Sequence, residues 1–109
     1  MKINATNINF DQLESIAAAS IASLETSNRA DAKRWSNAIR KAVTELTTNP
    51  YWQFADGELL IKSDKSDKIY TANGTCFDSD GEPCKAFANN RPCFHRSASR
   101  LLLRMAEQA

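Results

Sequence analysis

The sequence of 109 residues lacks any long hydrophobic run. No stretch approaches the roughly 18 to 20 apolar residues that a membrane-spanning helix needs, and the polar start at residues 1–6 has no signal-peptide core. These absences predict a cytoplasmic protein, or a nuclear one if the source has a nucleus. A large excess of one charge is also missing. The chain has 14 basic and 13 acidic residues, whereas nucleic-acid-binding domains are usually clearly basic.

Cysteine and histidine are scarce, and they occur close together. The chain has three cysteines and one histidine, and all of them lie between residues 76 and 95. In a reducing compartment, cysteines are more often metal ligands or reactive thiols than disulfides. The odd number of cysteines agrees with that interpretation. A domain of this size buries only a modest core, so a bound metal would help to stabilise it.

The first half of the chain carries two helical patterns of apolar residues. A loose leader is expected at residues 1–9. The first pattern then places these residues on one face: Phe10, Leu13, Ile16, Ala17, Ile21 and Leu24. Asn9 or Asp11 is expected to cap this helix. Most of its other positions are Ala and Ser, a surface that suits close packing on the same domain or on a second copy of the chain.

The second helix is predicted from about residue 29 to 48. Its apolar stripe consists of Trp35, Ile39, Val43 and Leu46. Asn49-Pro50 ends it, because the residue before a proline disfavours helix. Residues 1–49 therefore form a helical N-terminal part. We expect one domain over residues 1–109, since this length leaves little room for two.

The middle of the chain is predicted to form an antiparallel β-meander. Its β-prone segments are residues 51–54, 58–62 and 68–72. Asp56-Gly57 and Asn73-Gly74 are strong hairpin-turn signals, and residues 63–66 form a polar turn between them. The meander is expected to lead directly into the cysteine-containing segment.

The last helix is predicted from about Phe94 to Glu107, with apolar and basic residues on opposite faces. The apolar face carries Phe94, Ala98, Leu101, Leu102 and Met105. The basic face carries Arg96, Arg100 and Arg104, with Leu103 exposed among them. The predicted fold class is therefore α+β, with two N-terminal helices, a small antiparallel meander and a C-terminal helix that a metal ion attaches to the sheet.

Cys76, Cys84, Cys93 and His95 are the candidate metal ligands. Three thiolates and one imidazole suit a single tetrahedral Zn²⁺ ion, which is borderline-soft and has no geometric demand of its own. Cys76 and Cys84 flank a turn that contains Asp80-Gly81. Cys93 and His95 lie at the start of the last helix, whose N-terminus favours negative thiolates. We therefore expect one structural zinc ion that connects the sheet to this helix.

The C-terminal half has a spacing pattern of its own. Cys84 is followed by an eight-residue spacer and then by Cys93-Phe-His95 at the start of a Leu-rich helix. This pattern resembles the SWIM-type zinc finger, which reads Cys-x-Cys, a spacer and Cys-x-His. The strand predicted before Cys84 also resembles the strand that precedes the ligands in that family. The resemblance covers about residues 58 to 105, and a SWIM-like module would occupy residues 50–109.

The fourth ligand is the point at which this sequence departs from the family pattern. In a strict Cys-x-Cys pair the first cysteine would fall at Glu82. Cys76 instead lies six residues upstream, as though a small loop had been inserted. Cys76 is the preferred ligand because it is otherwise a free cysteine close to the site. Glu82 is the alternative.

Three other interpretations of this segment have less support. The cysteines could be buried small side chains, or two of them could form a disulfide, but the polar surroundings argue against burial. Residues 78–82 look like the start of a calcium-binding loop, which needs a Glu at its twelfth position. That position is Asn89, so a solvated turn is favoured.

No catalytic role is predicted. A catalytic zinc keeps an open coordination position, whereas four ligands would fill this site. If Cys76 did not bind, a water could, and Glu82 could act on that water. The fragment Glu82-Pro83-Cys84 resembles part of the cytidine-deaminase pattern but lacks its second cysteine. A nucleophilic Cys93–His95 pair is equally weak, because such pairs normally converge from separate elements.

Local charge makes nucleic-acid contact a hypothesis. The segment 91–109 contains four arginines and one acidic residue, a balance of 4 − 1 = +3. The candidate phosphate contacts are Arg91, Arg96, Arg100 and Arg104. An ordinary solvated face is the alternative explanation of such a stripe.

The resemblance to SWIM fingers implies binding to DNA or to proteins, which is what that family is predicted to bind. In the family the finger is usually an appendage, whereas here it would be a large part of a short chain. The preferred hypothesis is a small accessory protein with a structural zinc ion, which binds DNA through the basic face of the last helix. The alternative is a protein-interaction adaptor or inhibitor, homodimeric through its N-terminal helices, without nucleic-acid contact. Neither hypothesis involves a membrane.

Overall fold

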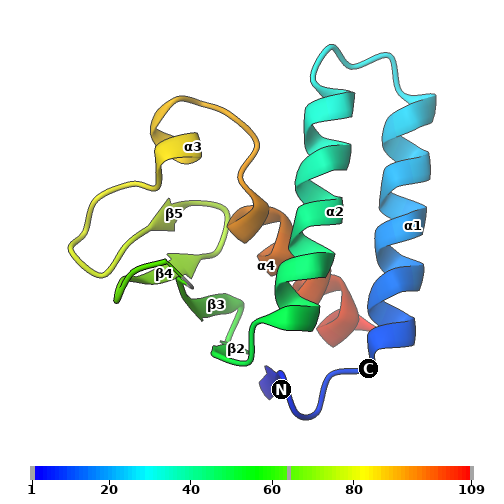
Figure 1. The fold of residues 1–109 in the computed structure, drawn as a ribbon. Coiled ribbons are helices and arrows are strands. Elements are labelled where there is room, and N and C mark those ends of the chain that lie inside the picture. Colours follow the sequence, from blue (N-terminus) through cyan, green and yellow to red (C-terminus); the bar gives the residue numbers. More distant parts are fainter. Residues whose placement is uncertain (1, 64, 109) are drawn as a thin grey trace.

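The structure, a computed structural model, describes residues 2–63 and 65–108. Asp64, in the predicted polar turn, lies outside the described residues. Figure 1 shows the elements in chain order: β1 (Lys2–Asn4), α1 (Phe10–Thr26), α2 (Ala32–Thr48), β2 (Trp52–Ala55), β3 (Glu58–Lys62), β4 (Ile69–Ala72), β5 (Cys76–Phe77), α3 (Lys85–Ala88) and α4 (Phe94–Glu107). The fold is α+β, as predicted.

The strands form one antiparallel sheet in the order β1-β2-β3-β4-β5. Alternate residues of each strand point to the same face. The face that packs on the helices carries Ile3, Trp52, Phe54, Leu59, Ile61, Tyr70, Ala72 and Cys76. This alternation directs the side chain of Cys76, at the β5 edge, toward the helical layer.

The helices cover one face of the sheet. α4 contacts β3 and β4, and α1 and α2 form an antiparallel pair that packs on α4 (Figure 1). The buried residues of α1 are Leu13, Ile16, Ala17 and Ser20. Most of the apolar face of α1 is therefore covered by α2 and α4, although Phe10 is 38% exposed. None of the helices within residues 2–63 and 65–108 is long and apolar enough to cross a membrane.

The prediction of a loose leader at residues 1–9 is wrong, because Lys2–Asn4 forms a strand. β1 pairs with β2, and Ile3 lies opposite Phe54 with only 6% of its surface exposed. Its partner strand begins some fifty residues later in the chain, and three residues carry too little periodicity to reveal a strand. Asn9 is the N-cap of α1, and its side chain accepts a hydrogen bond from the N–H of Gln12 (3.0 Å).

The second helix begins later than predicted. α2 starts at Ala32 after Asp31, rather than at about residue 29. Its buried face is also rotated slightly about the helix axis from the predicted apolar stripe, since Trp35 and Val43 are only half-buried. The residues of α2 that are buried instead include Ser36, Ala38 and Ala42. Small side chains let α1 and α4 approach this helix closely.

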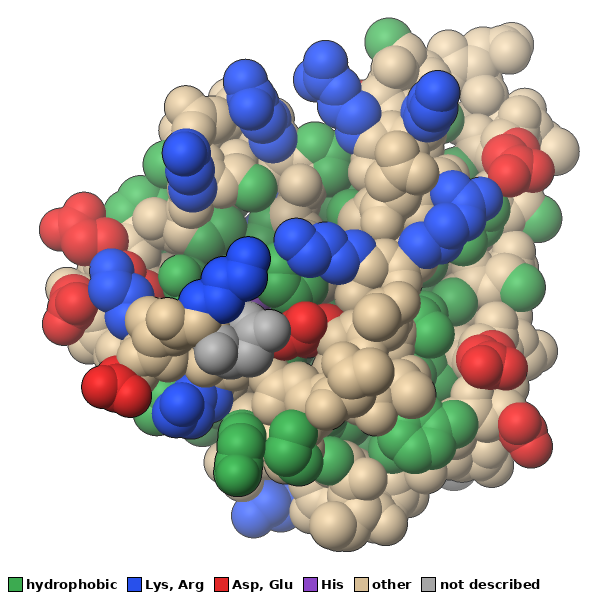
Figure 2. Space-filling model, viewed as in Figure 1, with side chains coloured by type: hydrophobic (Ala, Val, Ile, Leu, Met, Phe, Trp, Pro, Cys, Tyr) green, Lys and Arg blue, Asp and Glu red, His purple; other side chains and the backbone are tan. Residues whose placement is uncertain are grey.

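Basic side chains gather on the face of the molecule seen in Figure 2. They lie over α2 and over the segment around α3, on either side of a hollow with hydrophobic side chains in it. Cys84, Cys93 and His95 line a pocket together with several of these basic residues.

Candidate metal centre

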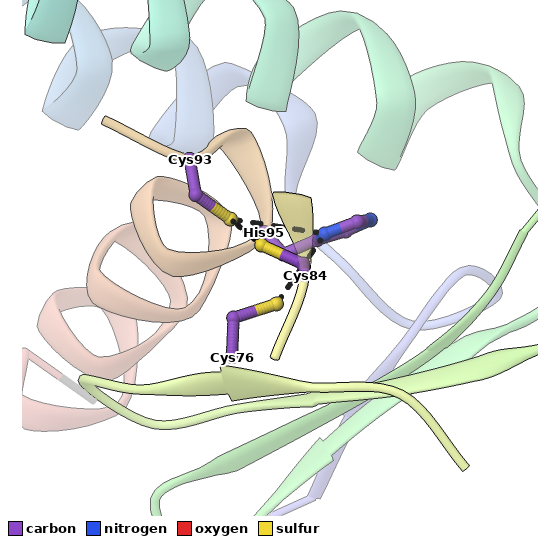
Figure 3. A group of neighbouring side chains, drawn as sticks. All are labelled: Cys76, Cys84, Cys93 and His95. Carbon is purple, nitrogen blue, oxygen red and sulfur yellow. Dashed lines mark hydrogen bonds between the residues drawn. The ribbon is translucent and has the colours of Figure 1, made fainter. Parts of the chain in front are cut away.

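Cys76, Cys84, Cys93 and His95 come together between the sheet and α4. Cys76 comes from β5, Cys84 immediately precedes α3, and Cys93 and His95 stand at the start of α4. Their side chains point toward one another (Figure 3). All four are buried, with Cys76 fully covered and none of the others more than 8% exposed. The sequence therefore predicted correctly which residues gather.

A hairpin brings Cys76 to Cys84. The N–H of Cys84 donates to the carbonyl of Cys76 (3.0 Å), and Phe77 pairs with Pro83. Gly81, with φ of +82°, takes the left-handed conformation at the tip of this hairpin. The intervening residues thus form a tight turn, and the two cysteines become cross-strand neighbours despite their separation in the sequence.

Asp78 organises this turn from inside. Its carboxylate Oδ1 accepts hydrogen bonds from the N–H groups of Asp80 (2.9 Å) and Glu82 (3.0 Å), and Oδ2 accepts one from Lys68 Nζ (3.1 Å). Its side chain is only 5% exposed. Burial opposes ionisation, but these contacts hold the pKa of Asp78 below its usual value. The turn is therefore built around a buried carboxylate, an inward role that the sequence did not indicate.

Glu82 is not a member of the cluster. Glu82 is exposed, and its backbone N–H and carbonyl both form hydrogen bonds with Asp78. Among the described residues, the group of ligand-type side chains that could hold a metal ion contains Cys76 and omits Glu82.

Cys84 and Cys93 both occupy helix N-cap positions. The Sγ of Cys84 accepts a hydrogen bond from the N–H of Phe87 (3.4 Å), and α3 begins at the next residue. Cys93 is the N-cap of α4. The short helix α3 was not predicted. It shortens the spacer, and so helps Cys84 and Cys93 to lie with their sulfur atoms 3.5 Å apart.

The distances fit a tetrahedral metal site. Tetrahedral zinc has bonds of about 2.3 Å to sulfur and 2.0–2.1 Å to nitrogen. These bond lengths imply separations of roughly 3.8 Å between two sulfur ligands and roughly 3.6 Å between a sulfur and a nitrogen ligand. The Sγ of Cys76 lies 3.5 Å from Nδ1 of His95, and the Sγ of Cys93 lies 3.8 Å from the same atom. All four ligand atoms lie within 4.8 Å of one another. The cluster could therefore hold one metal ion with little rearrangement.

The protonation of the three thiols is unequal. Hydrogen bonding from Cys76, reinforced by His95, lowers the pKa of Cys93 to about 4 against the opposing effect of burial. The interaction with Cys93, together with burial, raises the pKa of Cys76 far above its usual value. Burial also raises the pKa of Cys84. Within the cluster, Cys93 therefore loses its proton more readily than Cys76 or Cys84.

Aromatic rings fix the orientation of His95. The ring of Tyr70 stacks on the imidazole at 4.5 Å between centroids, with 18° between the planes. The ring of Phe94 lies on it at 4.0 Å, tilted by 41°. Tyr70 comes from β4, so this contact joins the sheet to α4 beside the candidate ligands. The sequence did not indicate this role for Tyr70.

The four candidate nucleic-acid contacts do not share one surface. Arg96 lies between two rings, with its guanidinium carbon 5.6 Å from the ring centroid of Trp35 and 5.1 Å from that of Phe87. Arg91 lies in the segment before α4, beside the metal cluster. Arg100 and Arg104 are exposed on α4, and Arg104 donates to the hydroxyl of Ser20. Leu103, predicted to be exposed, is 42% exposed.

Comparison with known proteins adds no relative. No protein-family model, curated protein or solved structure matches the chain. Its interpretation therefore depends on the chemistry of its own residues.

Proposed function

We propose that this protein is a small SWIM-like zinc-binding module whose zinc ion is structural and whose ligand is nucleic acid. The buried cluster of Cys76, Cys84, Cys93 and His95 is the observation that carries the proposal. Sulfur and imidazole donors at these separations match Zn²⁺ better than a hard cation such as Mg²⁺, which prefers oxygen. The resident ion would connect β5, α3 and α4.

A structural role follows from the number of donors. Four protein ligands complete a tetrahedral shell and leave no position for a reacting water molecule. The four ligand side chains are also buried, although a groove that is open to solvent lies beside them. We therefore assign the protein no enzymatic activity and treat the metal as part of its fold.

The SWIM-like assignment is supported by the start of α4. Cys93 and His95 are separated by one residue at a helix N-terminus, as in the family pattern. Cys76 lies six residues upstream of the position that the family pattern gives the first cysteine. The hairpin that places Cys76 beside Cys84 is a simple structural explanation of this difference. An insertion confined to a turn would leave the ligand set of the module intact.

DNA binding is supported by the exposed cations near α4. Arg100 and Arg104 are exposed on α4, and they line a pocket with residues of the N-terminal helices and with Arg29, which is paired with Asp31. Within the part of the chain that the structure describes, no carboxylate lines this pocket. Lysine and arginine side chains that neutralise phosphates provide most of the affinity of non-specific nucleic-acid binding.

Two measurements test the proposal. Native mass spectrometry of the full chain should find one zinc ion, and chelation should remove it and lower the stability of the segment 76–95. Fluorescence anisotropy with labelled DNA should show binding at low salt that weakens steeply as salt rises. A metal-free protein as stable as the zinc-loaded one would contradict the zinc assignment. A zinc-loaded protein that binds neither single-stranded nor duplex DNA would favour the protein-adaptor hypothesis.

A further inference from the structure

A basic groove lies directly beside the metal centre. Its lining includes Arg34 and Lys41 of α2, and Lys85 and Arg91 of the segment 85–92. Figure 2 shows basic side chains on either side of a hollow. The groove has a volume of about 510 Å³ and is open to solvent. Arg34 and Lys41 are seven residues apart, so they stand on the same side of α2, two turns from each other.

Acidic residues are missing from the described lining of this groove. Arg34, Lys41, Lys85 and Arg91 are all exposed, and among the described residues no Asp or Glu lines the groove. The ion pairs within residues 2–63 and 65–108 use other cations, namely Arg29, Arg40 and Lys68. Four cations around one opening, without a carboxylate in its described lining, favour an anionic ligand that carries several charges.

The floor of the groove is apolar and aromatic. Tyr70 and Phe94 line it together with Cys84, Cys93 and His95. Lys41 Nζ lies 4.4 Å from the centre of the Phe94 ring, so one cation reaches across the aromatic surface. An aromatic floor with a cationic rim matches a chain of flat bases joined by phosphates, because bases stack on rings while phosphates pair with Lys and Arg.

We propose that this groove binds single-stranded nucleic acid, with phosphates on Arg34, Lys41, Lys85 and Arg91 and a base against Tyr70 or Phe94. This inference rests on the proposed nucleic-acid function and adds the site and the form of the ligand. A duplex keeps its bases inside the stack and presents phosphates alone, so it would leave the aromatic floor unused. An unpaired strand can turn a base inward and use both the floor and the rim.

The metal and the groove are linked through the chain. Lys85 follows Cys84 directly, and Arg91 precedes Cys93 by two residues. The whole segment 85–92 is thus held at both ends by candidate ligands. Metal loading therefore fixes the position of two of the four cations. By linkage, a strand bound in the groove should tighten metal binding by the same factor by which metal tightens strand binding.

The test uses the zinc-loaded full chain and a labelled oligothymidine. Anisotropy titrations would compare the wild type with Lys41→Glu/Arg91→Glu in the groove. Lys2→Glu/Lys33→Glu is the control, because it changes the net charge equally and both residues are exposed and outside the groove. We expect about a tenfold or greater loss of affinity for the groove variant and little loss for the control. Thermal unfolding would confirm that both variants are folded.

A third variant separates this inference from the function on which it rests. Arg100→Glu/Arg104→Glu alters the outer face of α4 and leaves the groove intact. If this variant loses DNA binding and the groove variant does not, the groove proposal is wrong while DNA binding stands. The groove proposal is equally wrong if the wild type binds duplex more tightly than single strand. If the wild type binds no nucleic acid, both proposals fall.

Chelation of zinc should weaken oligothymidine binding, and unchanged binding by the metal-free chain would also overturn the groove proposal.

Discussion

Cys76 and Cys84 are direct neighbours across a hairpin, with the N–H of Cys84 donating to the carbonyl of Cys76 at 3.0 Å. Eight positions separate them in the sequence, but the turn returns the chain to the same place. The side chain of Cys76 points inward because the alternation of the sheet directs it to the helical layer. A spacing that differs from the family pattern is therefore compatible with one compact set of donors.

The fourth ligand can be identified by substitution. Cys76→Ser should strongly weaken zinc binding, because it removes one of four donors from a buried site. Glu82→Gln should leave the zinc affinity near that of the wild type, since Glu82 is exposed and lies outside the cluster. Competition with a chromophoric chelator would measure both affinities. A strong loss of zinc affinity in Glu82→Gln and little loss in Cys76→Ser would identify Glu82 as the fourth ligand.

Asp78 should control the site without being a ligand. Asp78→Ala removes the acceptor for the N–H groups of Asp80 and Glu82, so the hairpin should loosen and zinc affinity should fall. Asp80→Ala is a matched control, because the exposed Asp80 takes part in this network only through its backbone. Equal zinc affinity in the two variants, measured by chelator competition, would show that the turn does not position Cys76.

Acid should weaken the turn only at low pH. The pKa of Asp78 is lower in the folded protein than its ordinary 3.8, so its carboxylate stabilises the fold at pH values above 3.8. That contribution is lost as the pH falls through the folded-state pKa. Acid unfolding of the wild type and Asp78→Asn, both prepared without metal, should converge below that point. A stability difference that persists at the lowest pH would have another origin.

Zinc binding should release protons from particular thiols. Cys93 is already a thiolate at neutral pH, because its pKa is lowered to about 4. Cys76 and Cys84 have raised pKa values and must lose their protons to bind. We therefore expect release of about two protons per zinc ion near pH 7, and an affinity that falls as the pH is lowered. Calorimetry in buffers of different ionisation enthalpy gives this number directly. Release of three would mean that Cys93 is protonated before binding.

Arg96 and Arg100 should differ in what they contribute. The guanidinium of Arg96 lies over the rings of Trp35 and Phe87, and two such contacts are worth about 1 to 2 kcal/mol of stability in total. Arg96→Ala should lower the free energy of unfolding of the zinc-loaded protein by that amount. Arg100→Ala, at an exposed position, should change it by less than about 0.5 kcal/mol. Denaturant titration followed by circular dichroism would measure both. Equal stability of the two variants would mean that the ring contacts add nothing.

The parts of the fold with strong local signals were predictable. α4 spans Phe94–Glu107 in the structure, as the helical period and the break before it predicted. Asp56 and Gly57 take positive φ angles of 54° and 78°, as a two-residue hairpin turn requires. Each of these features is determined by residues close together in the sequence.

The parts that depend on distant contacts were not predictable. The strand around Ile3 exists because β2 is available to pair with it. The spacing of Arg96 places it on the outer face of α4, yet α2 and α3 supply rings that cover it. The groove cations Arg34 and Lys85 lie on different elements that only the folded chain brings together. The candidate ligands were easier to find, because few residue types bind zinc and this chain has few of them.

The pairing of β1 with β2 affects how the chain reaches its native state. The meander from β2 to β5 consists of neighbouring strands and can form quickly. β1 reaches its partner only after the whole segment that contains α1 and α2 has folded back, and closing so long a loop is entropically costly. We therefore expect β1 to join the sheet late and to open early. Amide hydrogens of residues 2–4 should exchange faster than those of β3, although Ile3 is as buried as many residues of the core.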